Sequence, residues 1–283
     1  MRLGHGADSL GLARATAIAR RLGAEPVALD AAGAEATSTL RAALLAGEVD
    51  AVVHALPDPH LAPADGVALA AVPRRGDARD VLVTSRGGSL DALPAGARVG
   101  VGSARRRAQL LALRPDLEAA DVGDAEDALA RVGEADDALA AVIVAAADLG
   151  FLGRSDETTE HLSLTDWLTE PGQGALALET RRGEERAVKK LDHRPSRLAV
   201  QAERAVPALL GAGPDAGIGA HALLADGLFF LSARVSAPDG SRHLTSSHAL
   251  YPEDVRDPAA ELAKRVADEL LDSGAAALLG RRP

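Results

Sequence analysis

The residues best suited to chemistry lie in the stretch 98–114, which joins a short apolar segment, a Gly-Ser turn at Ser103 and three consecutive arginines. The pattern predicts a strand that turns into a helix beginning with Arg105, Arg106 and Arg107. Such a turn presents free backbone N–H groups and the positive end of the helix dipole. Because arginine is unfavourable in a first helical turn, the three indicate an anion bound at this terminus. The alternative is that solvated arginines simply line an exposed helix.

Asp58 and two histidines are further candidates. Asp58 follows the apolar segment 50–54, where a carboxylate can act as a base or stabilise a cation, although aspartates beside proline are also common turn formers. His54 is better interpreted as a hydrogen-bonded core histidine than as a base, whereas for His5 the two interpretations are balanced. The other histidines lack metal-ligand spacing, so no metal site is predicted.

Composition excludes several classes of function. Among 283 residues, 31 basic and 41 acidic side chains give a net charge of −10, which argues against nucleic acid or anionic membranes as partners. The chain has no cysteine, which rules out disulfides, thiolate metal sites and cysteine nucleophiles. No signal segment opens the sequence and no run approaches the ~18 apolar residues of a membrane span, so a cytoplasmic protein is predicted.

The elements that must position these residues follow an α/β pattern over most of the chain. The apolar start 1–4, helices at 10–22 and 38–46 and strands at 26–29 and 50–54 predict a parallel α/β domain, with Asp8 or Ser9 as the cap of the first helix. Another strand is predicted at 67–72. A second α/β series follows, with strands at 80–84, 99–102 and 140–144 and a helix at 125–132. Further predictions are a strand at 175–178 and helices at 184–191 and 196–210.

The last part of the chain has a different pattern. An antiparallel sheet is predicted from three segments of alternating polarity, 219–224, 228–235 and 242–249, with a hairpin turn at Asp239-Gly240. The amphipathic pattern of 257–274 predicts a closing helix. The predicted fold is therefore α/β, with two α/β lobes and a small C-terminal α+β lobe. Ligands of such lobes bind at the carboxyl ends of strands, so Asp58 and the arginine turn are expected to face one cleft.

A series of short motifs adds to this interpretation. They are VHALPD at 53–58, DARDVLV at 77–83, SLDALPAG at 89–96, GSARR at 102–106, RPDL at 114–117, GQGA at 172–175, AERA at 202–205 and SAPDG at 236–240. In this order, across nearly the whole chain, they resemble the porphobilinogen deaminase family, also called hydroxymethylbilane synthase, of tetrapyrrole biosynthesis.

The resemblance implies both a domain organisation and a reaction. Two domains would resemble the lobes of periplasmic binding proteins, one at 1–73 plus 174–192 and the other at 78–168, with a third α+β domain at 193–283. The family protein is a monomeric transferase that condenses four porphobilinogen units, with loss of ammonia, onto a dipyrromethane cofactor. A cysteine of the third domain holds that cofactor through a thioether. By the family's motifs, Asp58 would be catalytic, and Ser103, Arg105 and Arg106 would bind anionic groups.

The sequence departs from the family at several of these positions. The cofactor cysteine falls at or beside Pro214, so a thioether cannot form. A lysine and a serine next to the catalytic aspartate fall at Pro57 and Ala55, and a lysine-bearing segment between 29 and 40 is largely missing. Other substrate-binding positions of the family fall at Gly6, Asp8, Val122, Ala128 and Phe151. Since each pyrrole unit carries two carboxylates, and an unpaired carboxylate taken from water costs several kcal/mol, two arginines are not expected to hold a growing chain.

Two hypotheses of different classes follow. In the first, favoured by these losses, the protein is an inactive family member retained to bind a partner protein or a small anionic ligand, such as porphobilinogen or another pyrrole carboxylate. In the second, it is an active hydroxymethylbilane synthase with a non-covalent primer. A third possibility, an unrelated grafted activity, has no positive support in the sequence.

Overall fold

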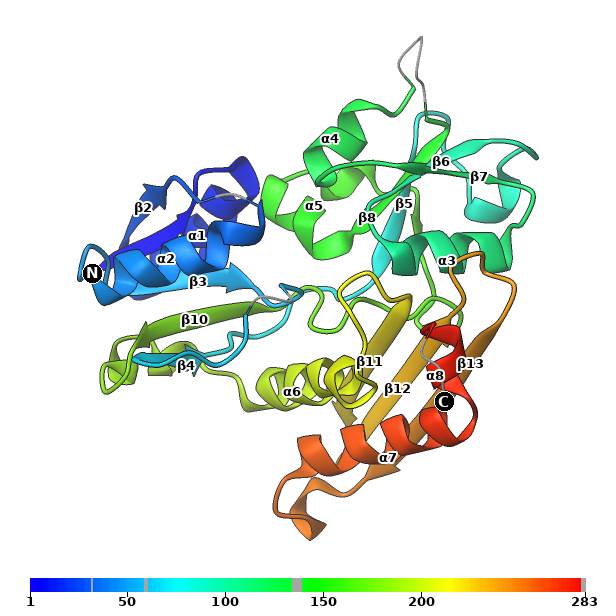
Figure 1. Cartoon of the computed structure of the whole chain (residues 1–283). Coiled ribbons are helices and arrows are strands. Elements are labelled where there is room, and N and C mark those ends of the chain that lie inside the picture. The colour runs from blue at the N-terminus through cyan, green and yellow to red at the C-terminus, as the bar shows by residue number, and fades with distance from the viewer. Residues whose placement is uncertain (32, 59–60, 134–138, 281–283) are drawn as a thin grey trace. The chain divides into compact units, whose positions relative to one another are not determined.

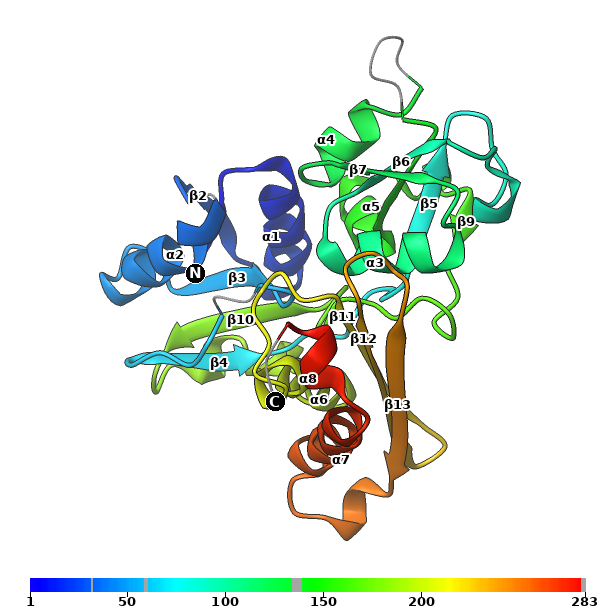
Figure 2. The same cartoon turned by 45° about the vertical axis from the view of Figure 1, so that its right-hand side comes forward.

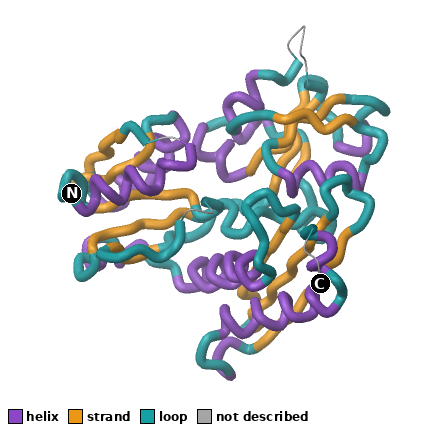
Figure 3. Tube along the Cα trace, in the orientation of Figure 1, coloured by secondary structure: helices purple, strands orange, loops and turns teal. Residues whose placement is uncertain are grey.

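A computed structural model of the chain describes residues 1–31, 33–58, 61–133 and 139–280 (Figure 1). The chain divides into two compact units, and among the described residues the first contains one sheet and the second two. Figure 3 marks the helices and strands along the chain. The first unit comprises Met1–Gly76, Gly150–Gly153 and Gly174–Arg197, and the second comprises Asp77–Leu149, Arg154–Gln173 and Leu198–Pro283. No helix among the described residues is long and apolar enough to cross a membrane.

The first unit is built on a five-stranded sheet with the strand order β2-β1-β3-β10-β4. The strands are β1 (Arg2–Gly6), β2 (Glu25–Leu29), β3 (Ala51–Ala55), β4 (Val67–Ala71) and β10 (Leu176–Arg181). The parallel arrangement predicted from the first part of the chain is confirmed for β1, β2 and β3. Strand β10, whose direction was not predicted, runs antiparallel to both β3 and β4. This strand enters the sheet after the chain has passed through the second unit, so no βαβ crossover imposes a parallel direction on it.

Two helices cover opposite faces of this sheet. Ile18 of α1 (Ser9–Leu22) packs in one apolar cluster with Val53, and Leu40 of α2 (Ala36–Leu45) packs in another with Val52. Successive residues of β3 thus point to the two faces, as the pleat requires. Asp8 caps α1 by accepting a hydrogen bond from the Gly11 N–H at 2.7 Å, and this confirms the predicted cap.

The helix predicted at 184–191 was wrong. Two 3₁₀ turns, η4 (Glu185–Ala187) and η5 (Lys189–Leu191), occupy this segment. Only Val188 and Leu191 are buried there, which is too narrow an apolar stripe to hold an α-helix against the sheet. The remaining 3₁₀ turns are η1 (Gly33–Glu35), η2 (Leu90–Ala92), η3 (Ser155–Glu157) and η6 (Pro252–Asp254).

The second unit contains a mixed sheet with the strand order β7-β6-β8-β5-β9. The strands are β5 (Asp80–Thr84), β6 (Arg98–Val101), β7 (Glu118–Asp121), β8 (Ala141–Ala145) and β9 (Glu160–His161). On one face Leu110 of α3 (Ala104–Leu113) packs in a cluster with Trp167. On the other face Leu129 of α4 (Ala125–Ala130) and Leu149 of α5 (Ala146–Leu152) share a cluster. Strand β7 was not predicted, because its residues Glu-Ala-Ala-Asp lack β-branched and aromatic side chains.

A separate three-stranded antiparallel sheet belongs to the same unit, and α6 and α7 lie on one face of it (Figure 2). Its strands are β11 (Ile218–Ala225), β12 (Leu228–Ser236) and β13 (His243–Leu250), and the helices are α6 (Arg194–Leu209), α7 (Pro258–Asp272) and the short α8 (Ala275–Leu278). Phe229 and Leu231 are fully buried between sheet and helices. The predicted fold class, two α/β sheets and a small α+β part, is confirmed, whereas a domain boundary at residue 193 stays a prediction.

Candidate functional site

The N-terminus of α3 has the predicted strand, turn and helix geometry. β6 ends at Val101, and the Ser103 hydroxyl caps the helix by accepting the Arg106 N–H at 3.2 Å. Buried Val101 and Leu110 fix the strand and the helix against the same apolar cluster. The cap and this packing hold the first turn of α3, with its arginines, in a defined position.

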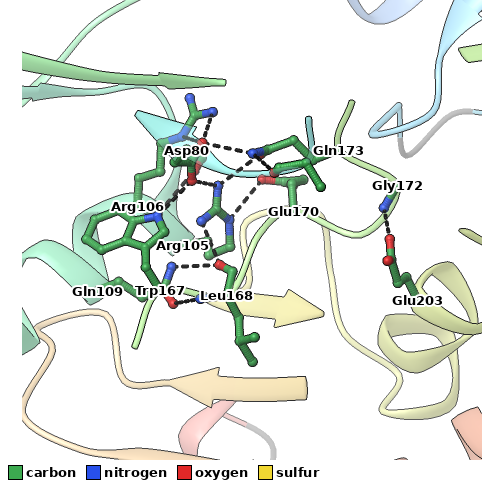
Figure 4. A network of polar contacts seen from close by, with 12 residues as sticks. Asp80, Arg105, Arg106, Gln109, Trp167, Leu168, Glu170, Gly172, Gln173 and Glu203 are labelled. Atoms are coloured by element: carbon green, nitrogen blue, oxygen red, sulfur yellow. Dashed lines mark hydrogen bonds and ion pairs between the residues drawn. The ribbon is translucent and has the colours of Figure 1, made fainter. Parts of the chain in front are cut away.

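The anion that the structure places beside this turn is the carboxylate of Asp80, the first residue of β5. Four side chains converge on it (Figure 4). Oδ2 accepts hydrogen bonds from Arg105 Nη2 at 2.8 Å and from the indole Nε1 of Trp167 at 2.7 Å. Oδ1 accepts from Arg106 Nε at 3.1 Å, from Arg106 Nη2 at 2.8 Å and from Gln173 Nε2 at 3.0 Å. Asp80 is 0% exposed.

Burial and neighbouring charges shift the pKa values of Asp80 and Arg106 in opposite directions. Burial raises the pKa of the Asp80 carboxyl, but the charges of Arg105 and Arg106 outweigh burial and hold the pKa well below its usual range. Burial likewise lowers the pKa of Arg106, and the Asp80 carboxylate outweighs it and raises that pKa. The cluster is therefore an ion-pair network around the buried, ionised carboxylate of Asp80.

The three arginines differ in their exposure and in the hydrogen-bond partners of their guanidinium groups. Arg105 is 2% exposed, and its guanidinium also donates to the Leu168 carbonyl at 2.9 Å and lies 3.4 Å from Glu170 Oε2. Arg106 is partly exposed, and among the described residues nothing bonds its Nη1 nitrogen. Arg107 pairs with the exposed carboxylate of Asp121. Most donors of the three guanidinium groups are thus taken up by groups of the chain itself.

Hydrogen bonds fix most residues of the segment 168–173, which follows Trp167. Gln109 of α3 bonds both the N–H and the carbonyl of Leu168, at 2.9 and 3.0 Å. The Ala220 N–H of β11 donates to the Thr169 carbonyl at 2.8 Å. Further along, buried Glu203 of α6 accepts the Gly172 N–H at 2.7 Å (Figure 4). The network therefore fixes this segment to α3, β5, β11 and α6 within the second unit.

Sequence reasoning did not assign a role to Asp80, Trp167 or Gln173. The sequence could have indicated a role for Asp80, because this acid is the first residue of a largely apolar strand that is buried on both faces. An acid at such a position needs a cation, and the neighbouring arginine cluster was the available source. Trp167 carried no such signal, since a single tryptophan in a loop has no periodicity to interpret.

Asp58, the predicted catalytic residue, lies in the first unit just after β3. It is half-buried, and the buried Thr37 hydroxyl of α2 donates a hydrogen bond to its Oδ2. The charge of Arg41 on α2 interacts with it as well. Asp58 thus belongs to the polar environment of α2, and it lies in a different unit from Ser103, Arg105 and Arg106.

A second buried charge cluster lies near Asp58. Arg41 Nε and Nη2 contact the two oxygens of Glu179 at 2.8 and 2.7 Å, and His54 Nε2 lies 3.2 Å from Glu179 Oε2. Burial raises the pKa of Glu179, but Arg41 and His54 outweigh it and lower the pKa to about 2. His54 therefore has a carboxylate partner in the core. His5 is also buried, with Nδ1 2.6 Å from the Gly6 carbonyl oxygen.

Pro214 lies exposed in the loop between α6 and β11. The residues present do not fit a thioether-linked dipyrromethane, because the sequence has no thiol and Arg105 is saturated by groups of the chain itself. No group of three or more His, Cys, Asp or Glu side chains in the described part of the chain is arranged to hold a metal ion.

Comparison with known proteins places the chain among its relatives. Residues 27–189 match the model of the porphobilinogen deaminase dipyromethane cofactor binding domain. The porphobilinogen deaminase of Leifsonia xyli subsp. xyli is 48% identical over 254 residues, covering 85% of this chain and 77% of the relative. That of Acidothermus cellulolyticus is 43% identical over 248 residues, covering 85% of this chain and 73% of the relative. The chain therefore belongs to the porphobilinogen deaminase family of tetrapyrrole biosynthesis.

Proposed function

We propose that this protein has lost the deaminase reaction of its family and is retained to bind a small anionic ligand or a partner protein. The observation that carries the proposal is the complete absence of cysteine from the sequence. A thioether needs a thiolate, and proline at the matching position, Pro214, supplies no nucleophile. A primer that is not anchored would have to be held by non-covalent contacts alone.

The distribution of charge supports the same proposal. Of the family's anion-binding residues, Ser103, Arg105 and Arg106 remain, and both arginines are bound to Asp80. Each porphobilinogen brings two carboxylates, and the growing chain accumulates them. Without matching cations, transfer of these carboxylates from water into a binding site costs several kcal/mol each. The same consideration weighs against an active synthase with a non-covalent primer.

The ligand site that we propose is the first turn of α3. Arg106 Nη1 and the backbone N–H groups of this turn are suited to one carboxylate, as in porphobilinogen or another pyrrole carboxylate. Asp58 would act only if catalysis survived, as a base or as a stabiliser of a cationic pyrrole. A monomeric protein in the cytoplasm is part of the same proposal.

The test is the mass of the protein after exposure to porphobilinogen. The full chain and the Leifsonia xyli relative are expressed in the same host, incubated with porphobilinogen, and weighed under denaturing and native conditions. We expect the bare polypeptide mass for this chain in both measurements and added pyrrole mass for the relative. A dipyrromethane retained by this chain, covalently or only in the native measurement, would contradict the proposal, and the second outcome would favour a non-covalent primer.

A further inference from the structure

The outward face of the three-stranded antiparallel sheet carries apolar side chains at one end. The inward face packs on α6 and α7, where Phe229 and Leu231 are fully buried. Because successive strand residues point to opposite faces, the residues that alternate with these point outward. We call five of them the outer patch: Leu223, Leu228, Phe230, Ala249 and Tyr251, the last directly after β13. The strand register makes Leu223 and Ala249 the partners of Phe230 on either side.

The outer patch exposes large side chains. Leu223 is 53% exposed, Phe230 40% and Tyr251 51%. The sequence has only three phenylalanines, one tyrosine and one tryptophan, so two of its five aromatic residues lie exposed in this patch. Single exposed leucines need no explanation, but a contiguous patch that includes aromatic side chains is typical of a surface that another molecule covers.

The opposite end of the same sheet face is covered within the second unit. A methyl group added at Gly219 would lie 2.8 Å from Leu168 Cβ. Arg234 donates from Nη1 to the Asp166 carbonyl at 2.6 Å. The segment 166–168 therefore lies against that end, and the outer patch occupies the end that this segment does not reach.

Acidic side chains border the outer patch. Asp226 lies in the turn between β11 and β12, and Glu253 and Asp254 lie in η6, three residues or fewer beyond Tyr251; all three acids are exposed. Arg256 is the one lysine or arginine in the segment 249–257, so it offsets only part of this charge. An apolar centre with a charged rim is the usual anatomy of a protein–protein interface.

We propose that the outer patch docks a partner protein whose apolar side chains are flanked by lysine or arginine. A second copy of this chain is a poorer occupant, because a two-fold contact would bring one acidic rim against the other and each copy has a net charge of −10. A basic rim on the partner would complement the acids and accelerate encounter. The inference deepens the partner-binding part of the function proposed above and rests on it, because it names the surface and the chemistry of the partner.

The test uses two synthetic amphipathic peptides that share the same leucines and carry either lysine or glutamate at every charged position. Binding of each fluorescein-labelled peptide to the full chain is followed by anisotropy. The lysine peptide should bind at least tenfold more tightly than the glutamate peptide. Leu223→Ser combined with Phe230→Ser should weaken binding of the lysine peptide at least tenfold. The matched control is Leu12→Ser combined with Leu45→Ser, which alters two leucines of the first unit that are each 50% exposed, and it should change the affinity less than twofold.

The acidic rim is tested separately from general attraction to an acidic protein. One triple variant neutralises the rim: Asp226→Asn, Glu253→Gln and Asp254→Asn. Asparagine tolerates the φ of 51° at position 226, so this variant keeps the turn. The control triple variant neutralises three exposed acids of the first unit: Glu25→Gln, Glu48→Gln and Asp65→Asn. The rim variant should lose at least fivefold in affinity for the lysine peptide, and the control less than twofold.

Several results would overturn the proposal. They are binding of neither peptide by wild-type protein, a folded Leu223→Ser, Phe230→Ser variant that binds as wild type does, and equal losses in the two triple variants. A wild-type dimer in sedimentation velocity that this double variant dissociates would assign the patch to a second copy and would equally overturn it. Porphobilinogen takes no part in these measurements, so their failure is distinguishable from persistence of the deaminase reaction.

Discussion

Individual residues of this chain balance buried cations with carboxylates from the chain itself. Asp80 does so for Arg105 and Arg106 in the second unit, and Glu179 does so for Arg41 in the first. Removing one partner of a buried pair leaves an uncompensated charge, and this costs far more than breaking an exposed pair. The two carboxylates are therefore expected to control stability as well as charge.

The pH dependence of stability should identify Glu179. Its pKa is about 2 in the folded protein, below the ordinary 4.5, so the unfolded chain takes up the proton at higher pH. Stability from this group is present above about pH 4.5 and is lost as pH falls towards 2, with a total on the order of 3 kcal/mol. Glu179→Gln should be less stable than wild type at pH 7, and the difference should shrink as pH falls, in urea unfolding followed by circular dichroism.

The control for this prediction is Glu184→Gln. Glu184 pairs with Arg181 at 2.7 Å, but half of its side chain is exposed. Its replacement should change stability by less than about 1 kcal/mol at any pH, as exposed ion pairs do. If the wild-type and Glu179→Gln stabilities fell in parallel with pH, the assigned ion-pair role of Glu179 would be wrong.

Among the elements, α3 carries several contacts at once. Its first turn binds Asp80, and Gln109 binds the backbone of Leu168. Its C-terminal half packs against the turn between β12 and β13. A methyl group added at Gly240 in that turn would lie 2.6 Å from Ala112 N and 2.7 Å from Ala108 O. The antiparallel sheet thus touches the backbone of the helix that begins with the arginines.

Replacement of Gly240 by alanine tests this contact. The residue has φ = 73°, so alanine there meets both backbone strain and the backbone of α3. Gly227, in the other hairpin turn of the same sheet, has φ = 80° and no atom within 4 Å of an added methyl group. We expect Gly227→Ala to cost ~1 kcal/mol from strain alone and Gly240→Ala at least ~2 kcal/mol, measured by urea unfolding. Equal costs would show that the hairpin does not depend on close contact with α3.

Local sequence pattern predicted most elements, because apolar periodicity and caps act over a few residues. The Asp8 cap and the strand, turn and helix around Ser103 are examples. The direction of β10 and the partners of Arg105 could not be predicted in this way. Both depend on residues about 25 to 120 positions away along the chain, brought together by tertiary folding. The carboxylate of Asp80 lies beside the arginines, and an anionic ligand at this turn stays a prediction.

For the whole molecule, the comparisons establish the family, and the loss of its reaction is a proposal that rests on particular side chains. The matched residues 27–189 and the relatives at 43% and 48% identity establish the family. A fold or family does not by itself preserve a reaction, which depends on particular side chains at the site. Here the thiol is missing, and the two retained arginines are neutralised within the chain.

The most direct measurement is turnover of porphobilinogen by the purified full chain, read as uroporphyrin absorbance after oxidation, with the Leifsonia xyli relative assayed in parallel. We predict product from the relative and none above a no-enzyme blank from this chain, even at high protein concentration. Product formation that is lost in Asp58→Ala would show that the deaminase reaction persists without a thioether-linked cofactor, and would contradict the proposed loss of function.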